Sequence, residues 1–299
     1  MENYVDFAVQ KAVELLAIDS PTGYTAEAEE FVLREFRALG FAAERTAKGG
    51  ILIDLGGENA DDALLLEAHA DTLGGMVAEI KGDGRLRIVN VGGMNANNAE
   101  AENCRVVTKF SGSYEGTLQL INASVHVNGD YASTKRSWDT VEVVLDEAVE
   151  SADDVKALGI SVGDFVCFEP RTRVTKSGYI KSRFLDDKLS VGILLGFAKY
   201  LHDEGKTPAR RVYAHVTVYE EVGPGGSDGG HLRRYGLRRR RPAVHGAAGL
   251  HLREGLRRPV LLRRREEAHR RRAEGARGLR RGHLSLLRLR RRGHAPRGL

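Results

Sequence analysis

The sequence contains only two cysteines, Cys104 and Cys167, and both lie in apolar stretches. Two cysteines are too few for a disulfide framework, so we expect buried free thiols. No apolar run approaches the roughly 20 residues that a membrane helix needs, and the first residues lack the basic region of a signal peptide. The sequence therefore favours a cytoplasmic protein without a membrane partner.

The segment 228–299 lacks nine residue types altogether: Ile, Phe, Trp, Met, Thr, Asn, Gln, Lys and Cys. It holds 23 Arg against five acidic residues, a net charge of 23 − 5 = +18, so residues 1–227 carry 5 − 18 = −13. A segment of Arg, Leu, Gly, Ala and His can hardly bury a core that offsets chain entropy. We therefore expect the C-terminal tail to be disordered or irregular.

Two interpretations of this tail differ in what they imply for function. Out-of-frame reading of a GC-rich gene explains its composition, because Arg, Gly, Ala, Leu, Pro and His dominate such reading. A genuine tail that binds nucleic acid or another polyanion is the alternative, since arginines bind phosphate with steep salt dependence. The segment has one aromatic residue, Tyr235, and no nucleic-acid-binding motif. We favour out-of-frame reading and predict no specific nucleic-acid partner.

The first 75 residues have the pattern of an α/β layer structure. Apolar residues at helical spacing predict helices over 3–17 and 26–39, the second with Thr25 as its N-cap and Gly40 just past its end. Two short apolar runs, 51–55 and 63–68, predict buried strands. Helices followed by buried strands are typical of an α/β fold.

Between residues 76 and 175 the pattern changes to short alternating runs separated by Gly, Asn and Asp. We expect strands there at 86–91, 105–110, 117–121 and 141–145, with a hairpin turn at Lys81-Gly82-Asp83-Gly84. Apolar helical and strand patterns return at 189–201 and 211–219. The β-rich region is therefore predicted to be an insertion within the α/β domain.

Three short motifs carry residues suited to chemistry. A buried strand ends in His69-x-Asp71, an Asp186-Asp187 pair precedes an apolar helix, and a Glu220-Glu221 pair ends an apolar strand. Each has an ordinary structural interpretation on its own: a histidine at a strand end, aspartates that cap a helix, and exposed glutamates.

Together, the three motifs indicate a metal site. Each lies at an end of an element, where α/β sheets place their binding sites. A metal-ligating imidazole needs an acceptor on its other ring nitrogen, and Asp71 is placed to be that acceptor for His69. Carboxylates mixed with imidazole suit zinc, cobalt or manganese.

With these motifs in this order, residues 1–227 resemble the tetrahedral aminopeptidases, also called glutamyl-aminopeptidase-like or deblocking aminopeptidases. Further stretches that match are Asp83-Gly84, Val91-Gly92-Gly93 and the segment 157–164. The resemblance implies a three-layer, exopeptidase-type α/β sheet with a small β-rich domain inserted after the His-x-Asp strand. It divides the chain into a catalytic α/β domain in two parts (1–75 and 176–227), the inserted domain (76–175) and the Arg-rich tail (228–299).

The resemblance also implies residue roles in metal-dependent removal of N-terminal residues from peptides. In that family two divalent ions, zinc or cobalt, are bound, with His69 and Glu221 as metal ligands here and Asp186 as the bridging ligand. Asp71 would orient His69, and Glu220 would be the general base that deprotonates the attacking water. Family members self-associate through the inserted domain, forming dodecamers.

The resemblance also implies a cis peptide bond between the bridging ligand Asp186 and Asp187. In addition, the family has two further metal ligands downstream of the glutamate pair. These two ligands are an Asp beyond the glutamate pair and a His near the C-terminus. Around the first position this chain reads Ala243-Val244-His245-Gly246, and none of the tail's six histidines has a family-like context. The second metal site is therefore expected to be incomplete and the activity impaired. A non-catalytic scaffold of the same fold, or a nucleic-acid-associated protein acting through its tail, is the alternative.

Overall fold

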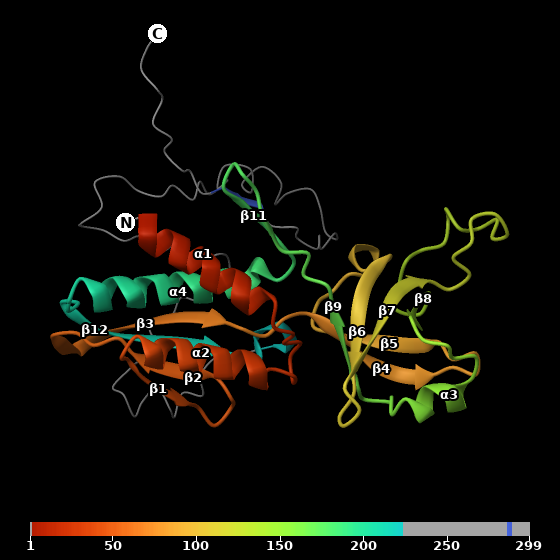
Figure 1. Cartoon of the computed structure of the whole chain (residues 1–299), viewed down its shortest axis with the longest axis horizontal. Coiled ribbons are helices and arrows are strands. Elements are labelled where there is room, and N and C mark those ends of the chain that lie inside the picture. Colours follow the sequence, from red (N-terminus) through yellow and green to blue (C-terminus); the bar gives the residue numbers. More distant parts are fainter. Residues whose placement is uncertain (1, 224–285, 289–299) are drawn as a thin grey trace, which may run out of the picture. The chain divides into compact units, whose positions relative to one another are not determined.

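A computed structural model describes residues 2–223 and 286–288 of the chain (Figure 1). The first part of it is a four-stranded sheet in the order β1 (Ala42–Arg45), β2 (Ile51–Asp54), β12 (Arg210–Thr217) and β3 (Asn59–His69). β12 runs antiparallel to β2 and parallel to β3, with Thr217 opposite His69. The carboxyl ends of β3 and β12 therefore lie side by side, which brings two of the three predicted motifs to one edge of the sheet.

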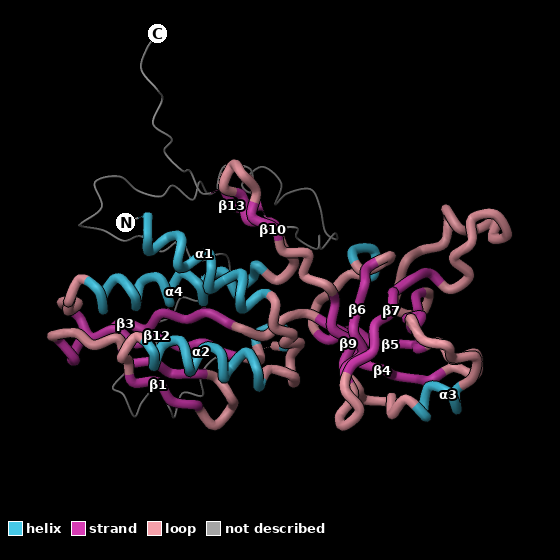
Figure 2. Tube along the Cα trace, in the orientation of Figure 1, coloured by secondary structure: helices cyan, strands magenta, loops and turns pink. Residues whose placement is uncertain are grey.

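Three helices share one hydrophobic core with this sheet: α1 (Glu2–Leu16), α2 (Ala26–Ala38) and α4 (Leu185–Asp203). The core residues of the strands alternate in sequence, such as Val212, Ala214 and Val216 of β12, because successive side chains point to opposite faces. Figure 2 shows α1 and α4 running next to each other. The opposite face carries a smaller cluster around Leu52 and Tyr213. The described residues thus supply two of the three predicted layers, the sheet and one layer of helices.

Six strands close into a barrel between β3 and α4. They follow one another around the barrel as β4 (Gly74–Ile80), β5 (Leu86–Val91), β8 (Val141–Leu145), β7 (Ser113–Leu120), β6 (Glu102–Val107) and β9 (Phe165–Phe168). Short helical segments, η1 (Ala96–Asn98) and α3 (Ala152–Ala157), lie in its connections, and its core is separate from that of the sheet. The α/β class with a β-rich insertion is confirmed.

The chain returns from the barrel through a small antiparallel sheet of β10 (Arg173–Val174), β11 (Tyr179–Lys181) and β13 (Leu286–Arg288). Arg183, just past β11, donates hydrogen bonds to the buried Glu102 of the barrel, which also pairs with Arg171. Because Glu102 is 6% exposed, two guanidinium partners compensate a charge that would otherwise be costly to bury.

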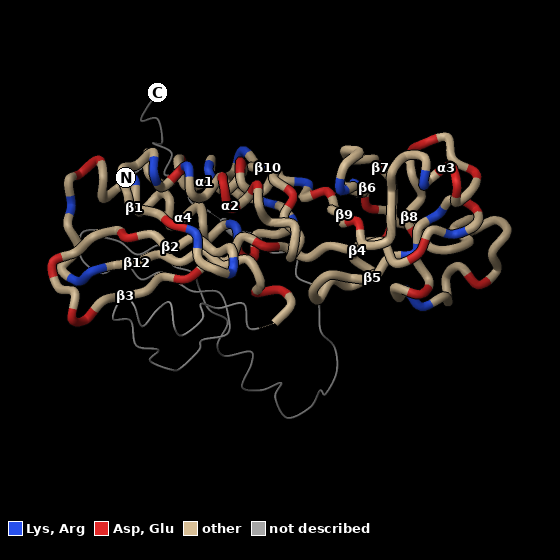
Figure 3. Tube along the Cα trace, turned by 90° about the horizontal axis from the view of Figure 1, so that it is seen from below, with Lys and Arg blue, Asp and Glu red and all other residues tan. Residues whose placement is uncertain are grey.

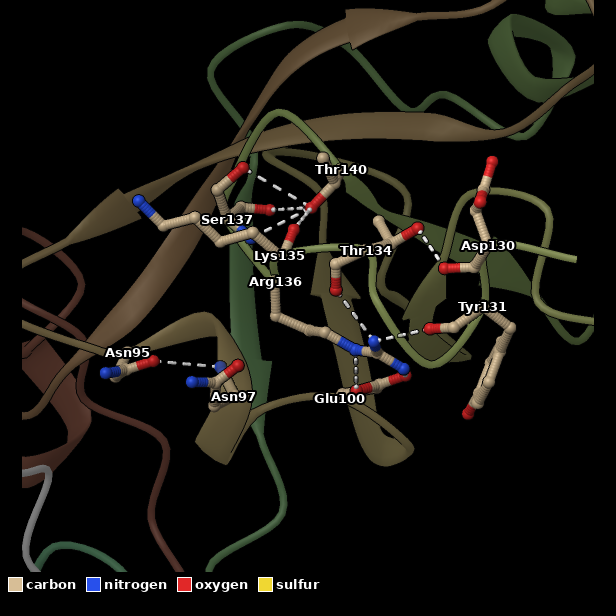
Figure 4. A network of polar contacts seen from close by, with 10 residues as sticks. All are labelled: Asn95, Asn97, Glu100, Asp130, Tyr131, Thr134, Lys135, Arg136, Ser137 and Thr140. Atoms are coloured by element: carbon tan, nitrogen blue, oxygen red, sulfur yellow. Dashed lines mark hydrogen bonds and ion pairs between the residues drawn. The ribbon is translucent and has the colours of Figure 1, made fainter.

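A network of polar contacts holds the long connection between β7 and β8 (Figure 4). The Arg136 guanidinium binds the Glu100 carboxylate and donates to the carbonyls of Tyr131 and Thr134. The Thr140 hydroxyl donates to the carbonyl of Lys135. These contacts give a loop with exposed apolar residues a defined conformation.

Smaller predictions have mixed outcomes. Cys104 and Cys167 are buried free thiols, and Gly40 has the positive φ of +81° expected just past a helix. Thr25 does not cap α2 with its side chain, because its hydroxyl donates to the Glu29 carboxylate instead. Within residues 2–223 and 286–288, no helix is long and apolar enough to cross a bilayer. Lys and Arg are interspersed with Asp and Glu along the described trace (Figure 3).

Candidate functional site

His69, the last residue of β3, has its two ring nitrogens in different surroundings. The residue is 6% exposed, and Nδ1 lies 3.0 Å from the Asp71 carbonyl oxygen and 3.4 Å from Asp71 Oδ1. Nε2 lies 3.5 Å from Asp186 Oδ1 and 3.7 Å from Glu220 Oε2. Asp71 thus holds the imidazole at Nδ1, and Nε2 faces the carboxylates of Asp186 and Glu220. A metal-ligating histidine is commonly held in this way, with one ring nitrogen bound to an acceptor and the other facing the metal.

Asp71 joins the ends of β3 and β12. Its side chain is fully buried, and Oδ2 accepts hydrogen bonds from the Thr22 hydroxyl (2.7 Å) and the Glu221 amide (3.3 Å). Oδ1 accepts one from the Glu220 amide (3.3 Å). Burial raises the pKa of Asp71, but hydrogen bonds with His69 and Thr22 outweigh burial, so the pKa lies below its usual value. Asp71 therefore stays ionised and fixes the turn that carries both glutamates.

Asp186 and Asp187 interrupt the first turn of α4 instead of capping it. Their peptide bond is cis, as the resemblance implied, and both have non-helical backbone angles. Phe184 precedes them with a positive φ of +61°. The Asp186 carboxylate lies near His69. Burial raises the pKa of Asp187 to about 6.

The charges at this site are strongly coupled. Burial opposes protonation of His69, but hydrogen bonds with Asp186 and Asp71 raise its pKa to about 11. Burial raises the pKa of Glu221 to about 7. His69 acts to lower this pKa, whereas the neighbouring carboxylates of Asp186, Asp71 and Glu220 raise it further. Several carboxylates therefore crowd around one imidazole, which is an arrangement that a bound cation would relieve.

The predicted site residues lie together, though not as a complete ligand set. The side chains of Asp186 and Glu220 lie within 3.7 Å of His69 Nε2, whereas Glu221 contacts Asp71 through its backbone amide. Among the residues that the structure describes, no three His, Cys, Asp or Glu side chains surround one point closely enough to hold a metal ion. The donor types fit a divalent ion in part, and the positions of the two further family ligands lie outside the described residues.

Two residues that the sequence did not single out support the site. Thr22 binds Asp71, as described above. Lys188, which is 1% exposed, donates from Nζ to the carbonyls of Leu15 (3.0 Å) and Ile18 (2.6 Å). The sequence offers no signal for either, since Thr22 lies in a turn and Lys188 in an apolar helix.

The fold is that of an exopeptidase-type α/β domain with an inserted barrel. Residues 49–230 match the sequence profile of the M42 glutamyl aminopeptidases. The match extends over more than half of the chain, so the protein belongs to the M42 glutamyl aminopeptidase family.

Individual relatives agree with this assignment. YhfE of Bacillus subtilis (strain 168), named provisionally as an aminopeptidase, is 40% identical over 214 residues, 72% of this chain and 62% of its own length. The glutamyl aminopeptidase of Lactococcus lactis is 25% identical over 218 residues, 71% of this chain and 59% of its own. The TET1 peptidase of Pyrococcus horikoshii superposes with a TM-score of 0.61 at 26% identity, covering 72% of this chain and 62% of that one. The chain thus spans about three fifths of the length of the relatives it matches.

Proposed function

We propose that this protein is a metal-dependent aminopeptidase that hydrolyses N-terminal residues from peptides. The observation that carries the proposal is the His69 ring, which is held at Nδ1 by Asp71 while Nε2 faces Asp186 and Glu220. His69, Asp186 and Glu221 would be the ligands of a divalent ion, zinc or cobalt. Bound ions of this kind supply Lewis acidity and lower the pKa of a water molecule.

The residues of the chain itself would then act in three ways. Glu220, whose side chain is 54% exposed, would accept a proton from water and later return it to the leaving amine. Asp71 keeps the ring of His69 in place. The amides of Glu220 and Glu221, bound to the Asp71 carboxylate, hold the glutamate turn against the end of β3.

Two further parts of the proposal concern the chain as a whole. The Arg-rich segment after residue 227 offers no family-like Asp or His ligand, so the second metal site would be incomplete and peptide hydrolysis impaired. The inserted barrel would mediate self-association, which is supported by the P. horikoshii TET1 peptidase, described as assembling into a tetrahedron or a large octahedral shell.

The test measures metal binding and peptide hydrolysis separately. Calorimetric titration with Co²⁺ or Zn²⁺ is expected to show binding to the full chain, and His69→Ala should abolish it, whereas the exposed His126→Ala should not. Release of N-terminal residues from short peptides should be slow for this chain and much faster for a version with the reading frame after residue 227 corrected. Equal metal binding by His69→Ala and the parent would refute the site, and equal hydrolysis by the two versions would refute the impairment.

A further inference from the structure

The connection between α1 and α2 is hydrogen-bonded to the residues at the end of β3 and just after it. Pro21 forms a parallel bridge with Thr72. The Thr72 amide donates to the Ser20 carbonyl (2.8 Å), the Thr22 amide donates to the Thr72 carbonyl (3.2 Å), and the Ser20 hydroxyl donates to the Ala70 carbonyl (2.7 Å). Because these bonds tie residues 20–22 to residues 70–72, the backbone of Thr22 is held beside the end of β3.

At this fixed position the Thr22 hydroxyl donates to Asp71 Oδ2 at 2.7 Å. Thr22 is 6% exposed and the Asp71 side chain 0%, so water does not substitute easily for either partner. The contacts of the same carboxylate with His69 Nδ1 and with the amides of Glu220 and Glu221 are 3.3–3.4 Å long. The Thr22 hydroxyl therefore makes the shortest of these contacts with the Asp71 carboxylate. That carboxylate also contacts His69 and the amides of Glu220 and Glu221.

We propose that Thr22 is a positioning residue for the candidate metal centre. Its hydroxyl sets the rotation of the Asp71 carboxylate, and through that carboxylate the orientation of the His69 ring and of the Glu220–Glu221 turn. The expected effect on metal binding rests on the proposed function. The expected effect on the Asp71 carboxylate and the Glu220–Glu221 turn applies to the metal-free protein as well.

A second anchor fixes the other end of the same connection. Lys188 Nζ binds the carbonyls of Leu15 and Ile18, so the chain that leads to Thr22 is attached to α4 shortly after Asp186. The segment 18–22 thus links the helix that carries Asp186 to the carboxylate that holds His69.

The chain offers closely matched variants for the test. Thr22→Val removes the hydroxyl and keeps the shape, and Thr22→Ser keeps the hydroxyl. Thr25→Val is the control, because Thr25 is also buried (7% exposed) and its hydroxyl also donates to a carboxylate at 2.7 Å, that of Glu29, away from the site. The full-length proteins are compared by Co²⁺ calorimetry, by the visible spectrum of bound Co²⁺ and by thermal unfolding.

Loss of a group that directly orients a metal ligand weakens metal binding roughly 10- to 100-fold. Because Thr22 acts through Asp71, we expect Thr22→Val to weaken Co²⁺ binding by about 10-fold, the lower end of that range, and to change the cobalt spectrum. Thr22→Ser should stay within a few-fold of the parent, and Thr25→Val should bind like the parent despite a comparable loss of stability. Parent-like affinity for Thr22→Val, or an equal loss for Thr25→Val, would overturn the inference.

A metal-free measurement separates this inference from the proposed function. Amide hydrogen exchange at Glu220 and Glu221 should be faster in Thr22→Val than in the parent and unchanged in Thr25→Val, because both amides donate to Asp71. If the parent binds no metal, the proposed function fails, and the exchange rates still decide the role of Thr22. Identical exchange in Thr22→Val and the parent would overturn the inference.

Discussion

Buried ionisable side chains near the site each have a specific reason to be tolerated. The Lys188 ammonium lies at the carboxyl end of α1, where the carbonyl of Leu15 and the helix dipole favour a cation. Burial nonetheless lowers the pKa of Lys188 to about 7. Asp71, by contrast, is held ionised by its hydrogen-bond donors. Each of these two buried groups thus has hydrogen-bond partners that stabilise its charged form: carbonyl oxygens for Lys188, and N–H and O–H donors for Asp71.

Cys104 allows a prediction about pH and stability. Burial raises the pKa of this thiol from 9.0 to about 12, and Asp146 adds to the effect. The native state therefore keeps a proton that the unfolded chain loses, so this contribution to stability is fully present below about pH 9 and is lost as the pH rises towards 12.

We expect the free energy of unfolding to fall with pH above 9 less steeply in Cys104→Ala than in the parent, as measured by urea denaturation. Both proteins retain Cys167, whose pKa is raised mainly by burial and only in small part by Cys104, so their difference reports chiefly Cys104. Neither thiol of the native parent should react with a disulfide reagent at pH 8. Rapid labelling of the native protein, or parallel pH profiles, would show that Cys104 is accessible to water.

At the scale of elements, α1 and α4 pack more closely than ordinary side chains permit. A Cβ added at Gly192 would lie 2.7 Å from both the Ala12 Cβ and the Ala8 carbonyl oxygen, and one at Gly196 2.7 Å from the Ala8 Cβ. Two glycines a turn apart, opposite two alanines, therefore let the backbones approach. This packing places the end of α1 where Lys188 can reach it.

Gly192→Ala is expected to destabilise the protein although alanine is the better helix former. The overpacking should cost about 1–3 kcal/mol, which exceeds the gain of about 1 kcal/mol in helix propensity. Gly82→Ala, where an added Cβ meets nothing within 4 Å, should change the free energy of unfolding much less. Thermal and urea unfolding of the three proteins measures this. A Gly192→Ala variant as stable as the parent would mean that α1 can move away.

The sequence predicts elements well where one face is clearly buried. Strands β5 and β8 lie at their predicted bounds, because apolar residues alternate there between turn residues. β1 escapes prediction because only Ala43 of its four residues is buried, and β10 because both its residues are exposed. Thr25 misleads because its hydroxyl has a competing carboxylate partner four residues away.

The site divides in the same way. His69 and Glu220 are marked by local patterns, because each lies at or just past the end of a strand and these two strand ends meet at one sheet edge. Asp186 lies in the first turn of α4, and only the order of the three motifs links it to the site. The chemical roles of all three stay predictions. Thr22 and Lys188 are not found from sequence, because their partners lie 49 and 173 residues away and no local pattern marks such a contact.

For the whole molecule, charge is divided unevenly along the chain. Residues 1–227 carry −13 and residues 228–299 carry +18. We expect the full chain to bind DNA duplexes of unrelated sequence with equal affinity, because arginines contact phosphate and nothing in the segment indicates base recognition. Binding should fall steeply between low and moderate salt in a fluorescence anisotropy titration. A preference for one sequence that persists at high salt would contradict this expectation.

Assembly is a second whole-molecule prediction. We expect light scattering coupled to size-exclusion chromatography to give a mass that is a multiple of the single chain, since the inserted barrel is proposed to self-associate. The measurement should be made at moderate salt, so that attraction between oppositely charged segments is screened. A monomeric mass under these conditions would contradict the proposed role of the barrel.

The insertion of the barrel between β3 and α4 also has a consequence for the order of folding. The site joins distant parts of the chain: the contact between Asp71 and the Glu220 amide spans 149 residues. Closing so long a loop in an unfolded chain has an entropic cost that grows with its length. The barrel contains the antiparallel neighbours β4–β5, β6–β7 and β7–β8, which are close in sequence and can pair early. Once folded, it shortens the effective loop, so we expect the residues of the site to come together late, after the barrel has formed.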